Sequence, residues 1–242
     1  MKILVFSDIH ANLTALETVL ADAGDMDGYW CLGDLVGYGP DPNQVIKCVR
    51  QLPNLVCILG NHDAATIKKI EIEAFNEEAQ QTISWTQKTI SKENMDFLKS
   101  LPAIIETENF TLTHGSPRHP IWEYILDTRT ATQNFDYFDN PFCLIGHTHI
   151  PVIYFLSDEG SLANLILPNS HTKVTLSPRS ILNPGSIGQP RDHDPRAAYA
   201  ILDTEELLFE FHRVPYDIPS VQKRMEKAGL PQRHAQRLEF GW

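Results

Sequence analysis

Five short apolar segments of this 242-residue chain each end in a small cluster of carboxylate, amide or imidazole side chains. In chain order the clusters read SDIH, GD, GNHD, THG and GHTH. Glycine adjoins four of the five, where it permits a tight turn and a close approach of the backbone: Gly33, Gly60, Gly115 and Gly146. Such clusters are typical of an α/β protein whose site lies at the carboxyl edge of parallel strands.

The first hundred residues alternate between apolar runs typical of buried strands and segments of helical periodicity. Strands are predicted at 2–6, 29–32 and 54–59, and helices at 12–23 and 42–52. Because short links connect these β-α units, we expect their strands to form a parallel sheet. Residues 72–101 predict two further helices that meet near Ser91.

The second half of the chain is richer in predicted strands. A hairpin is expected over 103–115, with its turn near Glu108 and Asn109, and a short helix near 129–135. Further strands are expected at 142–146, 152–156, 173–177, 180–183, 197–203 and 207–214, before a helix at 217–230. Residues 157–172 are predicted to be a surface loop. The two halves together predict a single α/β domain over residues 1–242, with two sheets covered by helices.

The charge balance and the cysteines limit the partners and the compartment. The net charge is −11, from 20 basic and 31 acidic residues. A protein that grips duplex DNA usually presents a basic face, so nucleic-acid binding is not expected. The four cysteines form no CxxC pair, and the chain opens without a signal-like segment and holds no apolar run long enough to span a bilayer. We therefore expect a cytoplasmic protein with reduced thiols and no membrane association.

The residue types of the five clusters favour a metal site. Taken singly, Asp8 is explained as a helix cap, Asn61 and Asp63 as turn residues, and His114 as a hydrogen-bonded histidine. Taken together, five strand ends carry the same chemistry, which single explanations do not account for. Oxygen and imidazole ligands without cysteine suit Mn, Fe, Zn, Ni or Co. His147 and His149 stand two residues apart, so on an extended chain they point to one side.

In this order, the motifs DxH, GD, GNHD, HG and GHTH resemble those of the calcineurin-like metallophosphoesterases, and most closely the small prokaryotic phosphodiesterase and phosphatase branch. The resemblance implies a four-layer α/β/β/α sandwich of two mixed β-sheets flanked by helices. It also implies two divalent metal ions, with manganese as the first expectation. Carried over by position, the metal ligands are Asp8, His10, Asp34, Asn61, His114, His147 and His149, with Asp34 shared by both ions.

The resemblance further implies a mechanism and a class of substrate. His62 is the expected catalytic residue, which stabilises or protonates the leaving oxygen, and Asp63 or another carboxylate could orient it. Metal-activated hydroxide would attack a phosphodiester or a small nucleotide-like phosphate ester. Candidates for substrate binding are Arg191 in the segment NPGSIGQPRD, and Arg118 and Tyr124 after the THG motif.

Two features qualify this interpretation. The protein serine/threonine phosphatases of the family carry GDxxDRG at the second motif, whereas this chain reads GDLVGYG, with Gly37 and Tyr38 in place of Asp and Arg. A protein substrate is therefore less expected. Trp122 is either a stacking surface for a base or ordinary core packing. Residues 64–101 and 116–141 are candidate lid segments.

Alternative functions remain open on the same residues. The site would also suit a phosphomonoesterase or a protein phosphatase. A mononuclear hydrolase would leave half of the ligands idle. The retromer scaffold subunit is similar to these phosphoesterases and acts mainly as an interaction protein, so a non-catalytic metal-binding scaffold is a further alternative. Because every ligand position is filled and His62 is present, we expect an enzyme.

Overall fold

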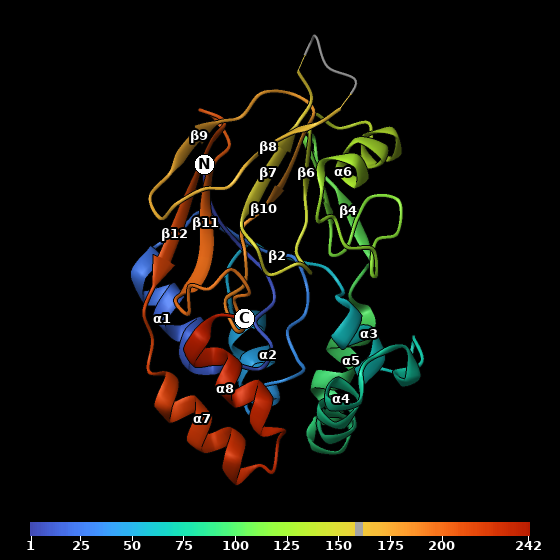
Figure 1. Cartoon of the computed structure of the whole chain (residues 1–242), viewed down its shortest axis with the longest axis vertical. Coiled ribbons are helices and arrows are strands. Elements are labelled where there is room, and N and C mark those ends of the chain that lie inside the picture. The colour runs from blue at the N-terminus through green and yellow to red at the C-terminus, as the bar shows by residue number, and fades with distance from the viewer. Residues whose placement is uncertain (158–161) are drawn as a thin grey trace.

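The first of two six-stranded sheets contains the N-terminal strands. The computed structural model describes residues 1–157 and 162–242 (Figure 1). The strand order of this sheet is β3-β2-β1-β11-β12-β9. Strands β1, β2 and β3 are parallel, and the others pair antiparallel. Its members are β1 (Lys2–Phe6), β2 (Gly28–Cys31), β3 (Leu55–Cys57), β9 (Lys173–Thr175), β11 (Ala197–Asp203) and β12 (Leu208–Val214).

The second sheet has the order β4-β5-β6-β10-β7-β8. Strands β5, β6 and β10 are parallel to one another, and the outer three are antiparallel to their neighbours. Its members are β4 (Ile104–Glu106), β5 (Phe110–Thr113), β6 (Phe142–Leu144), β7 (Val152–Phe155), β8 (Asn164–Ile166) and β10 (Ser180–Asn183). The expected hairpin is thus confirmed as the antiparallel pair of β4 and β5.

Strand β8 corrects the prediction of a loop over residues 157–172. It has only three residues and lies at the edge of its sheet, where it pairs with β7 alone. Two of its side chains are exposed, so its sequence shows no alternation between apolar and polar residues. Residues 158–161 of the predicted loop lie outside the described residues.

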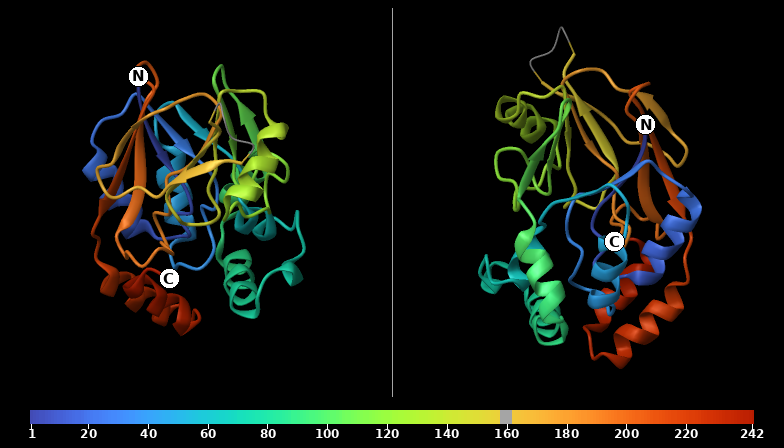
Figure 2. Two further views of the ribbon diagram at one scale, coloured as in Figure 1. Left: turned by 45° about the horizontal axis from the view of Figure 1, so that its top comes forward. Right: turned by 180° about the vertical axis from the view of Figure 1, so that it is seen from behind.

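Helices cover both outer faces of the sheets. Helices α1 (Leu13–Ala23) and α2 (Pro42–Arg50) pack on the first sheet, and α6 (Thr128–Asn134) with the 3₁₀ turn η2 (Phe135–Tyr137) packs on the second. Figures 1 and 2 show α1 and α6 on opposite outer sides of the sandwich. The fold class, two mixed sheets flanked by helices, is therefore confirmed. Among the described residues no helix is long and apolar enough to cross a membrane.

The remaining helices gather at one end of the sheets, at the bottom of Figure 1. They are α3 (Asn61–Thr66), η1 (Ile72–Ala74), α4 (Glu77–Thr89), α5 (Lys92–Ser100), α7 (Ile218–Lys227) and α8 (Gln232–Phe240). Ser91 caps α5 by accepting a hydrogen bond from the backbone N–H of Asn94, 3.2 Å away, which explains the helix junction predicted there. Helix α8 was not predicted.

Alternation along β1 shows how the core forms. Ile3 and Val5 face the second sheet, where they pack in a cluster that includes Phe110 and Leu144. Leu4 and Phe6, which alternate with them along the strand, belong instead to the cluster under α1 and α2. Both faces of β1 are therefore buried beyond Lys2, which is why its sequence is apolar from Ile3 to Phe6. This arrangement fixes the carboxyl end of the strand and with it the residues that follow.

The five polar clusters all follow strands of the two parallel sets. They come directly after β1, β2 and β3 in the first sheet and after β5 and β6 in the second. The carboxyl ends of parallel strands meet at the same edge of a sheet. The two sheets thereby bring their polar clusters together at the end of the sandwich that α3–α5 and α7–α8 surround (Figures 1 and 2).

Candidate metal centre and active site

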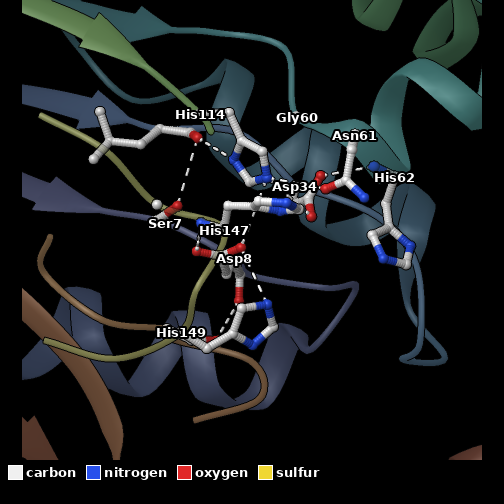
Figure 3. Close-up of polar contacts among 12 residues, drawn as sticks. Ser7, Asp8, Asp34, Gly60, Asn61, His62, His114, His147 and His149 are labelled. Carbon is white, nitrogen blue, oxygen red and sulfur yellow. Dashed lines mark hydrogen bonds and ion pairs between the residues drawn. The ribbon is translucent and has the colours of Figure 1, made fainter. Parts of the chain in front are cut away.

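Seven polar side chains from the five clusters converge at the edge of the two sheets. Figure 3 labels all of them except His10. All seven members of this cluster are buried: Asp8, His10, Asp34, Asn61, His114, His147 and His149. The ligand atoms of six members lie within 4.8 Å of one another in overlapping groups: Asp8, His10 and His149; Asp34, His114 and His147; and His10 and Asp34 with the neighbouring His62. The seventh member, Asn61, places its Oδ1 3.1 Å from Nε2 of His114. The residues that the sequence predicted as metal ligands are thus placed side by side.

Backbone carbonyls orient three of the imidazole rings. Nδ1 of His10 lies 3.1 Å from the carbonyl oxygen of Val36, and Nδ1 of His114 lies 2.7 Å from the carbonyl oxygen of Leu32. In His149 the distance from Nδ1 to the carbonyl oxygen of Gln189 is 2.5 Å. A carbonyl oxygen only accepts, so Nδ1 carries the proton in each ring. In the neutral ring Nε2 then presents a lone pair to the cluster, as a metal ligand must.

His147 approaches the cluster differently. Its Nε2 lies 3.2 Å from the carbonyl oxygen of Trp122, so Nε2 donates and Nδ1 holds the lone pair. Its backbone N–H donates to Oδ2 of Asp8 over 3.0 Å. This bond joins the end of β6 in one sheet to the end of β1 in the other, and so fixes the two halves of the cluster to each other.

Each aspartate directs one oxygen into the cluster. Oδ1 of Asp34 accepts the backbone N–H of His62 over 2.9 Å. Within the described part of the chain, Oδ2 of Asp34 and Oδ1 of Asp8 have no hydrogen-bond partner. Each lies against an imidazole nitrogen: Nε2 of His114 is 3.3 Å from the first oxygen, and Nε2 of His149 is 3.2 Å from the second. A buried carboxylate oxygen without a partner carries a large desolvation cost unless a cation lies against it. The donor set and these two oxygens therefore fit divalent cations.

The pKa values describe a charged set of carboxylates among mostly neutral rings. Burial opposes ionisation of Asp8, but His149 and His114 outweigh it, and the pKa of Asp8 lies below its usual range. Burial lowers the pKa of His149, and it lowers that of His147 to about 3. Burial also disfavours the charged form of His114, but Asp34 outweighs this and raises the pKa of His114 to about 10.

The backbone of this cluster is held in an unusual conformation. Five of the seven residues have a positive φ, which is uncommon outside glycine: Asp8 (53°), His10 (47°), Asp34 (54°), His147 (66°) and His149 (62°). Each such residue costs about 1–3 kcal/mol and persists only where its surroundings enforce it. Strain that collects on the candidate ligands, at the ends of separate strands, is characteristic of a functional site.

The catalytic candidate His62 lies beside the cluster at the start of α3. Its ring centroid is 4.9 Å from that of His10, 4.4 Å from Tyr38 and 5.0 Å from Phe75. Burial lowers its pKa to about 4, although Asp34 acts in the opposite direction. No described residue accepts or donates a hydrogen bond at its Nδ1.

Two neighbours of His62 account for this free nitrogen. Gly37 faces the ring, and a Cβ added there would lie 2.5 Å from Nδ1 of His62. Asp63 does not orient the ring, because its carboxylate accepts the backbone N–H groups of Val36 and Gly60, both over 3.1 Å. Asp63 therefore fixes the turns around the site, and burial raises its pKa to about 7.

The candidate substrate residues divide into two groups. Arg191 lies at the cluster, with Nη2 3.4 Å from the hydroxyl of Tyr38, and the Tyr124 ring stacks on His147 at a centroid distance of 3.8 Å. Arg118 is instead paired with Glu123, and it also donates to Gln133 over 3.2 Å. As a substrate ligand Arg118 stays a prediction.

The structure also places residues that the sequence left open or missed. Trp122 is 41% exposed and packs edge-on against Phe75 at 5.0 Å, so it is a rim residue and not core packing. His234 of the unpredicted helix α8 lies with its ring centroid 4.4 Å from that of Tyr38. Helical amphipathicity over residues 232–240 was the signal for α8, but polar residues dominate that segment.

Comparisons with known proteins agree with this geometry. Residues 1–207 match the family model described as the calcineurin-like phosphoesterase superfamily domain. A crystal structure of a metallophosphoesterase from Sphaerobacter thermophilus is 44% identical, with 100% of this chain and 99% of that chain covered and a TM-score of 0.91. An uncharacterized protein of Methanocaldococcus jannaschii is 38% identical over 251 aligned positions, which cover 99% of this chain and 98% of that protein.

A further match covers only a short part of the chain. A symmetrical bis(5'-nucleosyl)-tetraphosphatase of Pectobacterium carotovorum is 40% identical over 67 residues, which is 26% of this chain and 24% of that protein. The chain belongs to the calcineurin-like phosphoesterase superfamily. The prediction of a metal-dependent phosphoric ester hydrolase is confirmed at this level.

Proposed function

We propose that the cluster binds two divalent metal ions and that the protein hydrolyses a phosphodiester or a small nucleotide-like phosphate ester. One observation carries the proposal. Nε2 of His10 and Nε2 of His149 are 3.0 Å apart, and the carbonyl bonds at Nδ1 leave both nitrogens with lone pairs. Two lone pairs at this distance repel each other unless a cation accepts them.

The cluster divides naturally into two ligand sets. One set is Asp8, His10, Asp34 and His149, and the other is Asp34, Asn61, His114 and His147. Asp34 stands between them: its Oδ2 is 3.6 Å from Nε2 of His10 and 3.3 Å from Nε2 of His114. Mixed oxygen and nitrogen ligands suit Mn, Fe, Zn, Ni or Co, and we propose manganese as the first metal to test.

The residues of the chain then have distinct tasks. Bound divalent ions would supply an activated water nucleophile and positive charge for an in-line displacement at phosphorus. His62, with its low pKa, donates a hydrogen bond from a neutral ring to the leaving oxygen, and negative charge on the substrate would favour its protonated form. The guanidinium of Arg191 binds phosphate oxygens.

The rim of the site favours an aromatic leaving group such as a nucleoside. Trp122 and Tyr124 are 41% and 44% exposed and lie beside His147, which suits stacking on a base. The short match to a bis(5'-nucleosyl)-tetraphosphatase supports the same class of substrate. Tyr38 stands where the protein phosphatases carry arginine, which disfavours a phosphoprotein.

We propose that residues 1–242 form one domain, with 64–101 and 116–141 as lid segments beside the site. Four free cysteines suit a reducing, cytoplasmic location: Cys31, Cys48, Cys57 and Cys143.

Hydrolysis of bis(p-nitrophenyl) phosphate and p-nitrophenyl phosphate, with and without Mn²⁺, tests the proposal. We expect Mn²⁺-dependent turnover that favours the diester, and a loss of about 10²–10⁴-fold in His62→Ala. A strong preference for the monoester would indicate a phosphomonoesterase instead. Two bound metal ions without turnover of either ester or of nucleotide substrates would indicate a scaffold.

A further inference from the structure

Buried donors without partners collect on one side of the candidate active site. Within residues 1–157 and 162–242, the buried side-chain atoms that lack a hydrogen-bond partner include six from this one corner. They are Nδ1 of His62, Nε2 of Gln189, Nε of Arg191, Nδ1 and Nε2 of His234, and Nε of Arg237. The two unpaired carboxylate oxygens of the metal cluster are acceptors, whereas this second group consists mainly of donors.

Contacts through Tyr38 join these groups into one site. The ring centroid of Tyr38 lies 4.4 Å from both His62 and His234. The Arg191 guanidinium carbon lies 5.8 Å from the same centroid, and Nη2 of Arg191 lies 3.3 Å from Oε1 of Gln189. Tyr38 therefore links His62 with Arg191 and His234, beside the metal cluster.

Helix α8 brings the remaining donors. His234 and Arg237 stand three residues apart on this helix, so they project to the same face. His234 is fully buried, and burial lowers its pKa to about 3, so the ring is neutral. Each buried polar group without a partner is costly, and a ring with both nitrogens unpaired is rare in a native core. Such a ring indicates that a polar group belongs beside it.

The positive charge of Arg191 and Arg237 favours an anion as the missing polar group. Arg191 lies against the Tyr38 ring, and Arg237 stands one helical turn after His234, which contacts the same ring. Burial lowers the pKa of Arg237, and the charge of Arg191 acts in the same direction. The rest of the chain is strongly acidic, with a net charge of −11. Two guanidinium groups that flank the contacts of Tyr38 in such a protein suit phosphate oxygens, which accept several charge-assisted hydrogen bonds at once.

We propose that Gln189, Arg191, His234 and Arg237 form a second anion-binding subsite, which binds the non-reacting phosphate of an oligophosphate substrate. The inference rests on the proposed function, because the reacting phosphate must lie at the metal cluster beside His62. It adds a substrate class: a nucleotide with at least one P–O–P linkage is favoured over an ester with a single phosphate. His234 and Arg237 lie outside the residues matched by the family model, which end at 207.

Inhibition by AMP and by ADP shows whether the site binds a second phosphate. Hydrolysis of bis(p-nitrophenyl) phosphate is measured at fixed free Mn²⁺ with AMP or ADP as inhibitor. For the unsubstituted protein we expect ADP to inhibit about 10-fold more tightly than AMP, and we expect Arg237→Gln to remove most of this advantage. Arg233→Gln is the matched control, because Arg233 lies on the same helix but is exposed and pairs with Glu78 over 3.9 Å.

A second variant keeps the test valid if Arg237→Gln alters the helix. His234→Phe retains a ring against Tyr38 but removes both unpaired nitrogens. We expect it to lose the preference for ADP while its thermal midpoint stays the same or rises, since buried groups without partners are removed. A lower midpoint with the preference intact would show that His234 is structural and would overturn the subsite.

The outcomes for the two proposals differ. Metal-dependent turnover with an equal preference for ADP in the unsubstituted protein, Arg237→Gln and Arg233→Gln would overturn the subsite and leave the proposed function standing. An absence of metal-dependent turnover in the unsubstituted protein would overturn both. Equal inhibition by AMP and ADP in the unsubstituted protein would also count against the subsite.

Discussion

Gly37 is the residue that most directly controls the position of His62. Its φ is 93°, and a Cβ there would lie 2.5 Å from Nδ1 and 2.9 Å from Cγ of the His62 ring. The protein phosphatases of the family carry an aspartate at this position, and here glycine leaves room for the ring. The ring is then held by packing against Tyr38 and Phe75 and not by a carboxylate.

Gly37→Ala should therefore displace His62 without touching a metal ligand. We expect kcat/KM for bis(p-nitrophenyl) phosphate to fall by about 10–100-fold, because small displacements of a reacting group are costly. Gly24→Ala is the control: it also has a positive φ, of 70°, but an added Cβ meets nothing within 4 Å. Equal losses in both variants would mean that backbone strain, and not the position of His62, causes the effect.

Among the elements, the segment between β5 and α6 carries the aromatic rim. Glu123 holds this segment together: its carboxylate accepts from Ser116 Oγ over 2.7 Å and from Asn134 Nδ2 over 2.8 Å, and it pairs with Arg118. Burial opposes ionisation of Glu123, but these bonds, led by the one from Arg118, outweigh it and lower the pKa to about 2. Trp122 and Tyr124 flank this anchor on the chain.

Glu123→Gln should destabilise the protein in a pH-dependent way. A carboxylate whose pKa falls from 4.5 to about 2 on folding stabilises the protein fully above pH 4.5, and the contribution is lost as the pH falls toward 2. We expect the variant to lose about 1–2 kcal/mol of unfolding free energy at pH 7 and less near pH 3.5. Urea unfolding at both pH values measures this. A loss that does not change with pH would refute the charged anchor.

The accuracy of the predicted elements varied with the strength of their sequence signals. Strand β1 and helix α1 were clear, because apolar runs and helical periodicity reflect burial directly. Strand β8 was missed because a short edge strand needs no buried face. Helix α8 was missed because only two of its side chains are buried, His234 and Leu238, and one of these is polar.

The candidate site was predictable for a different reason. Carboxylate, amide and imidazole side chains follow strands whose carboxyl ends meet, so the sequence could predict that these side chains converge. Their assignment as ligands of two ions rests on the family resemblance. The surroundings of the cluster were not predictable from residue types. An arginine such as Arg118 suits a phosphate or a carboxylate equally well, and only the structure shows that Glu123 is its partner.

At the scale of the whole molecule, the metal cluster lies where the two sheets meet. Asp8 and Asp34 follow strands of one sheet, and His114 and His147 follow strands of the other. The bond from the backbone of His147 to Asp8 and the contact of His114 with Asp34 connect the sheets. Metal binding should therefore stabilise the sandwich as well as provide the chemistry, since an ion that binds only the folded protein favours folding.

A titration of metal-stripped protein with Mn²⁺ tests whether activity requires two bound ions. Bound metal per chain is counted at each addition, and turnover of bis(p-nitrophenyl) phosphate is measured on the same samples. We expect turnover to be absent in the stripped protein and to reach its maximum when two ions are bound per chain. Full turnover with one ion bound, or turnover without metal, would contradict the dinuclear site.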